Sequence, residues 1–401
     1  MPNVKIFMSD LHIGGGGKED DFSPVKEAKF CSVINALKEK YSRESELILL
    51  GDIFDLIEQV EDVEDAIKAS VKKHKDAIIA LQDWLISGRK IFYITGNHDH
   101  AIRQPHISDY LAKKLIGKNN VPWGNFVVDD WYASKSFRLY AEHGNRFDAD
   151  NNHAGEEMCF GDRIVKELLR LLESGENGRY STDKKWQDPW GLGVTNPFEF
   201  LDNARPRGNI ILLIERLIDE EYLTEDSKKD LKKRILDLYE QNPNASALKK
   251  FLLNNLRWLI SDGQVRSALD DHYLPYRNNA RAMMDEFNDH NIFKLRDLSY
   301  KPKFLVMGHT HFFDECRASK DCTYINLSSW LDTIYIDKKG KLADVMKNCP
   351  FLVFEKRGRA IKQTMYDASK NKPLEKPLDW ELLKKNRKKY GIPTTDHPFE
   401  E

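Results

Sequence analysis

The sequence has no surplus of either charge, because 62 Lys and Arg residues stand against 64 Asp and Glu residues, for a net charge of −2. This balance gives no general reason to expect a nucleic acid or a membrane surface as partner, although it leaves a local patch open. Long apolar runs are also missing. The stretch "IILLI" at 210–214 is far too short to cross a bilayer. We therefore expect a protein without a transmembrane segment.

Cysteine is scarce and irregularly spaced. The five cysteines, whose number is odd, form no CxxC pair; they are Cys31, Cys159, Cys316, Cys322 and Cys349. Disulfide frameworks and structural zinc sites need regular cysteine spacing, so the sequence favours a reduced, cytoplasmic protein. The first residues run directly into the strand pattern "NVKIFMSD", without the regions of a signal peptide, which agrees with this expectation.

What the sequence does contain is a repeated pattern in which an apolar, strand-like run ends in polar residues. The pattern occurs five times: "VKIFMSDLHIGG" (4–15), "ELILLGDIFDL" (46–56), "KIFYITGNHDH" (90–100), "SFRLYAEHGNRFD" (136–148) and "KPKFLVMGHTHF" (301–312). Helix-like stretches at 23–41 and 61–88, the second ending at Gly88, separate the first three. Alternating strands and helices predict an α/β core, in which the carboxyl ends of the strands line a ligand crevice.

The polar ends of these strands supply oxygen and imidazole donors and no thiolate. Seven of them are candidate metal ligands: Asp10, His12, Asp52, Asn97, His143, His309 and His311. Such a set suits Mn²⁺, Fe or Zn²⁺. Seven ligands are too many for one ion, but two ions about 3.5–4 Å apart can share a carboxylate and clamp a phosphoryl group.

The spacing within two of the motifs also suggested a geometry. Asp10 and His12 in "DLH", and the two histidines of "HTH", are predicted to lie on one side of an extended strand, because side chains alternate with period two. The adjacent glycines are predicted to let the backbone turn sharply and bring the ligands together.

The motifs "DLH", "GDIFD", "GNHD", "HG" and "GHTH", in this order, resemble those of the calcineurin-like metallophosphoesterases, and "YINLSSWLD" (324–332) resembles the closing strand of that family. The resemblance implies a two-sheet sandwich flanked by helices. It also implies two bound divalent ions, for which we expect Mn²⁺, with Fe or Zn²⁺ as alternatives. One ion would be held by Asp10, His12, Asp52 and His311, and the other by Asp52, Asn97, His143 and His309. His98 would protonate the leaving oxygen, and Asp99 would orient His98.

The implied reaction is hydrolysis of a phosphoester or pyrophosphate bond in a small phosphorylated metabolite or nucleotide-type substrate by a metal-activated hydroxide. "GDIFD", "GNHD" and "HGNRFD" are nearest to the branch that contains the UDP-2,3-diacylglucosamine pyrophosphohydrolases, whose best known members have arginine where His98 stands. Leu56 and Ile57 after Asp55 argue against a protein Ser/Thr phosphatase. Two alternatives stay open: a nuclease like Mre11 or SbcD acting on DNA, and a non-catalytic metal-binding scaffold.

The long middle of the chain predicts a discontinuous core. Residues 1–150 and 301–366 are expected to form the metallophosphoesterase core, and residues 151–300 a mainly helical insertion, because apolar residues recur there at three- and four-residue spacing. The insertion begins shortly after His143 and ends shortly before His309. We therefore expect it to form a cap over the edge of the sheets that carries the candidate metal ligands. Its mixed charges do not favour duplex DNA. In the charged segment 367–401, "KKNRKK" (384–389) is expected to be a solvated helix face, with anion or membrane-surface binding as the alternative.

Overall fold

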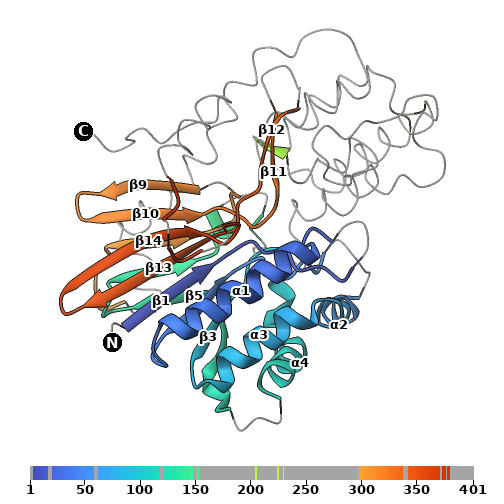
Figure 1. Cartoon of the computed structure of the whole chain (residues 1–401), viewed down its shortest axis with the longest axis horizontal. Helices are drawn as coiled ribbons and strands as arrows, with labels where there is room; N and C mark the ends of the chain where they lie inside the picture. The colour runs from blue at the N-terminus through green and yellow to red at the C-terminus, as the bar shows by residue number, and fades with distance from the viewer. Residues whose placement is uncertain are drawn as a thin grey trace.

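The computed structural model describes residues 3–16, 20–57, 62–117, 121–147, 151–152, 204–205, 298–311, 313–336, 342–370, 373–375 and 377–379, and the single positions 224, 229 and 296. Two β-sheets form the centre of the described part, and helices cover the outer face of one of them (Figure 1). This arrangement confirms the predicted α/β class with a two-sheet sandwich.

The first sheet has six strands in the order β14-β13-β1-β2-β3-β4. They are β1 (Asn3–Met8), β2 (Glu46–Leu50), β3 (Lys90–Ile94), β4 (Phe126–Asp129), β13 (Pro350–Arg357) and β14 (Ala360–Asp367). Strands β1 to β4 are parallel, and β13 is antiparallel to β1 with Phe7 opposite Leu352. The carboxyl ends of β1, β2 and β3 therefore lie at one edge of this sheet.

The second sheet has five strands in the order β5-β6-β8-β10-β9. They are β5 (Trp131–Ser134), β6 (Leu139–Glu142), β8 (Phe304–Met307), β9 (Phe313–Ser319) and β10 (Cys322–Leu327). A small third sheet joins β7 (Ala204–Arg205), β11 (Thr333–Ile336) and β12 (Leu342–Met346). Because β6 pairs in parallel with β8, the chain before residue 148 and the chain after residue 298 build one sheet together.

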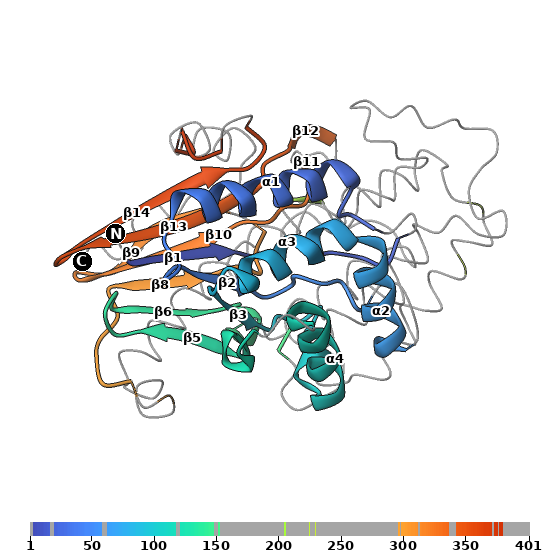
Figure 2. The same cartoon turned by 60° about the horizontal axis from the view of Figure 1, so that its bottom comes forward.

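The helices pack on the six-stranded sheet, on the side away from the five-stranded sheet (Figure 2). They are α1 (Pro24–Lys40), α2 (Val63–Lys73), α3 (Lys75–Ile86) and α4 (Pro105–Ile116), with short 3₁₀ helices at His100–Arg103 (η1), Trp123–Asn125 (η2) and Asn145–Phe147 (η3). The alternation along β2 shows how both faces become apolar. Leu47 and Leu49 pack toward the helices, and Ile48 and Leu50 pack between the sheets. Strands covered on both faces form nearly continuous apolar runs, as this one does.

The helix-like stretch 61–88 is two helices rather than one. Helix α2 ends at Lys73 and α3 begins at Lys75, with His74 between them at φ −100° and ψ 52°. The His74 ring lies between two carboxylates, with Nε2 2.8 Å from Asp20 Oδ2 and Nδ1 3.1 Å from Glu27 Oε2. These contacts hold His74 against the loop before α1, and the helix direction changes at this point.

The predicted helices of the insertion and of the C-terminal segment lie outside the described residues. Among the residues that the structure describes, no helix is long and apolar enough to cross a membrane. The described part of the chain is thus mainly the two sheets and the helices that cover the six-stranded sheet.

Candidate dinuclear metal centre

All seven predicted metal ligands lie at the edge where β1, β2, β3, β6 and β8 end. Asp10 and His12 follow β1, Asp52 follows β2, Asn97 follows β3, His143 follows β6, and His309 and His311 follow β8. Each of these side chains is buried, with at most 6% of its surface exposed. Two sheets and five strand ends therefore supply one compact polar site.

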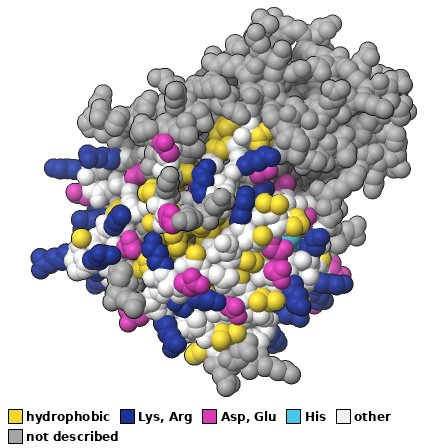
Figure 3. Space-filling view, viewed as in Figure 1, with side chains coloured by type: hydrophobic (Ala, Val, Ile, Leu, Met, Phe, Trp, Pro, Cys, Tyr) yellow, Lys and Arg dark blue, Asp and Glu magenta, His cyan; other side chains and the backbone are white. Residues whose placement is uncertain are grey.

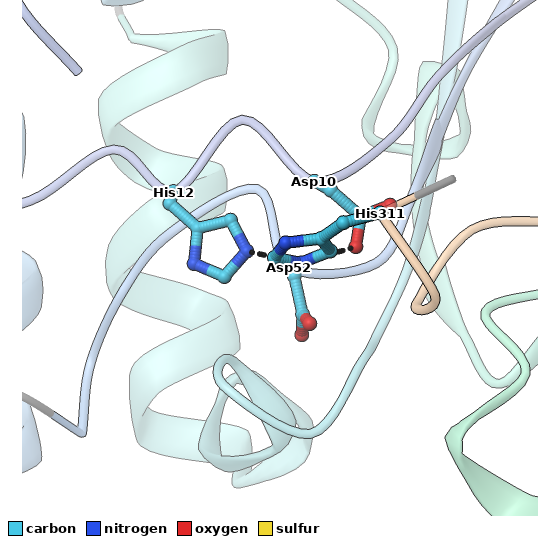
Figure 4. Close-up of side chains that lie close together, drawn as sticks. All are labelled: Asp10, His12, Asp52 and His311. Atoms are coloured by element: carbon cyan, nitrogen blue, oxygen red, sulfur yellow. Dashed lines mark hydrogen bonds and ion pairs between the residues drawn. The ribbon is translucent and has the colours of Figure 1, made fainter. Parts of the chain in front are cut away.

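The first cluster consists of Asp10, His12, Asp52 and His311, whose ligand atoms all lie within 4.8 Å of one another. In Figure 4 the His311 ring lies between His12 and Asp10. His311 Nε2 is 3.3 Å from His12 Nε2 and 3.3 Å from Asp10 Oδ1. Two ligands that bind one ion at about 2.0–2.2 Å lie roughly 3–3.5 Å apart, so these side chains have the spacing of ligands around a shared ion.

The second cluster consists of Asp52, His143 and His309. His143 Nε2 lies 2.9 Å from Asp52 Oδ2, while its Nδ1 lies 2.9 Å from the backbone oxygen of Leu50. The His309 ring packs against the His143 ring at a centroid distance of 5.4 Å. Asp52 belongs to both clusters, which is the position that a bridging carboxylate must have.

The predicted reason for the convergence of Asp10 with His12, and of His309 with His311, is wrong. Strands β1 and β8 end before these residues, and all four have positive φ, of 52°, 50°, 69° and 57°. They therefore lie in turns and not in extended strands. A non-glycine residue in this region costs about 1–3 kcal/mol, and such strain gathers at functional sites.

The predicted role of the glycines agrees with the structure at two positions. Gly51 has φ 81°, and a Cβ there would lie 2.3 Å from the His143 ring. A Cβ on Gly96 would lie 2.1 Å from Asp52 Oδ1. Only residues without a side chain allow the backbone to come this close to the ligands.

The turn after β3 packs directly on Asp52. The backbone N–H of His98 donates to Asp52 Oδ1 at 2.9 Å, and Gly96 is in close contact with the same oxygen. Asn97 lies between them and is 3% exposed. His98 is 8% exposed, more than any of the seven candidate ligands.

The structure assigns the carboxylate beside His98 to Asp55 and not to Asp99. Asp55 Oδ2 lies 3.1 Å from His98 Nδ1 and also 3.1 Å from His12 Nδ1. Burial alone would raise the pKa of Asp55, but the charge and hydrogen bonds of His98 and His12 outweigh it and lower the pKa below its usual range. Asp55 thus connects a candidate ligand to the candidate acid. The motif "GDIFD" contains this residue, but its spacing does not show which ring it contacts.

Asp99 has a different role from the one predicted. Its Oδ1 accepts a hydrogen bond from the N–H of Gly96 at 2.6 Å, and its Oδ2 accepts from the N–H of Ile53 at 2.8 Å and from Tyr93 Oη at 2.5 Å. Asp99 therefore joins the turn after β3 to the turn after β2. Burial, together with the charge of Asp52, raises its pKa to about 6.

The electrostatics of the site fit bound cations. Burial raises the pKa of Asp10, and the neighbouring Asp52 acts in the same direction. Burial alone would lower the pKa of His143, but the carboxylates of Asp52 and Asp10 outweigh it and raise this pKa to about 9. Two buried carboxylates therefore need positive charge within the site. The oxygen and imidazole donors around them are ligands that divalent first-row metals accept.

No curated protein matches the chain. A solved dimetal phosphatase from Danio rerio is 11% identical at a TM-score of 0.32, with 92% of this chain and 96% of that one covered. GAP50, the anchor in the inner membrane complex of Plasmodium, is 12% identical at a TM-score of 0.34, with 99% and 98% covered. Similarity at this level says nothing about activity. The family model of the calcineurin-like phosphoesterases matches residues 6–212, more than half of the sequence. The chain therefore belongs to the calcineurin-like phosphoesterase family.

Proposed function

We propose that this protein is a hydrolase that uses two divalent ions to cleave a phosphoester or pyrophosphate bond in a small phosphorylated metabolite or nucleotide-type substrate. The observation that carries the proposal is the place of Asp52 in both clusters, with Asp10, His12 and His311 on one side and His143 and His309 on the other. Asn97, next to Asp52 in the fold, completes the second set. We propose Mn²⁺ as the metal, with Fe or Zn²⁺ as alternatives, because oxygen and imidazole donors without a thiolate suit all three.

Two bound ions would lower the pKa of water toward neutrality and offset the negative charge of the phosphoryl group. The chain's own contribution is to hold and move a proton. Because His98 Nδ1 is engaged by Asp55 Oδ2, the proton for the leaving oxygen would be carried at His98 Nε2. The carboxylate of Asp55 stabilises the protonated ring, and Asp99 holds the turn from which His98 projects.

One face of the described part gives no support to a polyanionic substrate. On the face shown in Figure 3, Lys and Arg side chains are interspersed with Asp and Glu side chains over the described residues. A nucleic-acid site would gather basic side chains on one face to neutralise phosphates. We also propose a cytoplasmic location, where thiols stay reduced; among the described residues, Cys31, Cys322 and Cys349 are free thiols.

We further propose that residues 151–300 form a cap that selects the substrate. One described residue before this span and one near its end contact Glu142, which directly precedes His143. Arg146 Nη2 lies 2.9 Å from Glu142 Oε1, and Arg296 Nη2 lies 3.9 Å from Glu142 Oε2. These contacts support a span that leaves from and returns to the neighbourhood of the metal edge. Replacing residues 160–298 by a short Gly/Ser bridge should spare hydrolysis of a small activated ester and reduce the preference among natural substrates.

The test of the proposed function starts from metal-stripped protein. It is reconstituted with Mn²⁺, Fe²⁺ or Zn²⁺ and assayed on a panel of sugar nucleotides, dinucleotides, cyclic nucleotides and phosphomonoesters, with supercoiled plasmid and a short single strand as separate substrates. We expect metal-dependent release from a member of the small-molecule panel. Salt-sensitive cutting of DNA at low enzyme concentration would overturn the substrate class, and two bound ions without hydrolysis of any ester would overturn the enzymatic function.

A further inference from the structure

Residues 326–330, which we call the closing segment, end β10 and contact both turns that carry ligands of the first cluster. None of these five residues is more than 3% exposed. Most buried polar groups have a hydrogen-bond partner in the protein or in ordered water. Three residues of the closing segment, Asn326, Ser328 and Trp330, make hydrogen bonds to these turns.

Ser328 is the contact to His311. Its Oγ donates to the backbone oxygen of His311 at 2.9 Å, and its own N–H donates to Asn326 Oδ1 at 3.2 Å. Ser328 has φ 66° and His311 has φ 57°, so both backbones lie in a region that side-chain-bearing residues rarely adopt. The hydroxyl group therefore holds together two turns that neither residue would adopt on local preference alone.

Asn326 is the contact to the peptide before His309. Its Nδ2 donates to the backbone oxygen of Gly308 at 2.6 Å. A Cβ on Gly308 would lie 2.3 Å from Asp10 Oδ2, and the N–H of His309 donates to Asp10 Oδ1 at 3.1 Å. A shift of this peptide would therefore move the Asp10 carboxylate as well.

Trp330 attaches the closing segment to the six-stranded sheet. Its backbone N–H donates to the backbone oxygen of Asp10 at 3.0 Å, and its Nε1 donates to the backbone oxygen of Pro350 at 2.8 Å. The ring is fully buried and packs against Phe30 at a centroid distance of 5.9 Å. The closing segment thus joins Asp10, from the six-stranded sheet, to His309 and His311, from the five-stranded sheet.

We propose that Ser328 and Asn326 are positioning residues for the ion of the first cluster, because they fix the turn after β8, which carries His309 and His311, to the closing segment, and Trp330 ties that segment to Asp10. This inference rests on the proposed dinuclear function. A metal site holds its ligand distances to within about 0.2 Å. Apolar packing between two sheets is not directional. The hydrogen bonds from Ser328 and Asn326 define where His311 and Gly308 lie relative to the closing segment, and the bond from the Trp330 N–H defines where that segment lies relative to Asp10.

The sharpest variant is Ser328→Gly, because glycine adopts φ 66° more readily than serine, so that the hydroxyl group is lost without backbone strain. Removing hydrogen bonds that orient metal ligands lowers metal affinity by about 10- to 100-fold. We expect Ser328→Gly to bind one of its two ions with an affinity lowered by this factor, and Asn326→Ala also to bind that ion more weakly.

The matched control is Ser45→Ala. Ser45 is 1% exposed, and its Oγ donates to the backbone oxygen of Ser42 at 2.6 Å, just before β2 and far along that strand from Asp52.

Metal-stripped wild type and variants are titrated with Co²⁺. Calorimetry measures the affinity for each ion, and the visible absorption spectrum of the bound Co²⁺ reports the geometry of its ligands. The wild type is expected to bind two ions. Ser328→Gly should bind one of them more weakly with an altered spectrum, and Ser45→Ala should match the wild type in both. If Ser328→Gly is not folded by circular dichroism, the same titration of Ser328→Ala decides.

Unchanged Co²⁺ affinity and spectrum in the folded Ser328 variant would overturn the positioning proposal, as would an equal loss in Ser45→Ala. The proposed function fails in a different way. A wild type that binds two Co²⁺ ions and hydrolyses no ester refutes the function and leaves the positioning proposal standing. A wild type that binds no Co²⁺ refutes both.

Discussion

The contact of Asp55 with two histidines makes a sharp prediction for Asp55→Asn. One oxygen of Asp55 lies 3.1 Å from Nδ1 of both His12 and His98, and the residue is 3% exposed. Asparagine keeps the shape and removes the negative charge. A buried hydrogen bond to a charged group contributes about 1.5–3 kcal/mol. If His98 loses this stabilisation in its protonated form, the chemical step should slow by roughly 10- to 150-fold. His12, no longer oriented by a carboxylate, should bind its ion about 10- to 100-fold more weakly.

The assay separates the two effects of Asp55→Asn. The turnover number is measured at saturating Mn²⁺ with phenyl phosphate and with p-nitrophenyl phosphate, and metal affinity is measured in a separate titration. Because p-nitrophenolate leaves without needing a proton, the loss should be larger for the phenyl ester. The control is Glu46→Gln, which removes a carboxylate paired with Lys5 at 2.6 Å at the opposite end of β2. Equal losses for both esters, with unchanged metal affinity, would refute the assignment of Asp55.

Three further predictions follow from the same geometry. Asp52→Ala should lose both ions and all turnover, because both clusters contain Asp52, and a purified variant with two ions by elemental analysis would contradict this. His98→Ala should keep two ions but slow the reaction by about 10²–10⁴-fold; metal loss equal to that of Asp52→Ala would make His98 a ligand instead. His74, although burial alone would lower its pKa, has a raised pKa because of Asp20 and Glu27. Its stabilising effect is therefore complete below the unfolded pKa of about 6.5 and declines as pH rises through the folded pKa. The advantage of the wild type over His74→Gln in denaturant unfolding should be largest below about pH 6.5 and shrink as the pH rises above it, and parallel curves would contradict the role of these contacts.

The sequence by itself determined which residues meet at the site. Five apolar runs that end in polar residues identify the strands, and parallel strands bring their carboxyl ends to one edge. Asp10, Asp52 and Asn97, which follow parallel strands of one sheet, could therefore be assigned to one site from the sequence. Local signals also placed the helix that begins after Ser23, since Ser23 caps it and Pro24 occupies its first turn.

The roles of individual side chains were decided only by the tertiary structure. Asp55 and Asp99 stand at similar positions in their motifs, yet one contacts His12 and His98, and the other turns inward to Tyr93 and Ile53. Sequence spacing could not separate them, because the direction of a side chain in a turn depends on φ and ψ values that the neighbouring turns impose.

The same limit explains the error about the "DLH" and "HTH" motifs. Period-two alternation holds only while the backbone is extended, and here the strands end before Asp10 and His309, which have positive φ. Local preference would not choose such backbones. They persist because other segments hold them: Ser328, 17 residues along the chain, binds the backbone of His311, and Trp330, from the other end of the chain, binds that of Asp10. The choice of candidate ligands was thus possible from the sequence, whereas their geometry is a product of contacts with segments outside their own motifs.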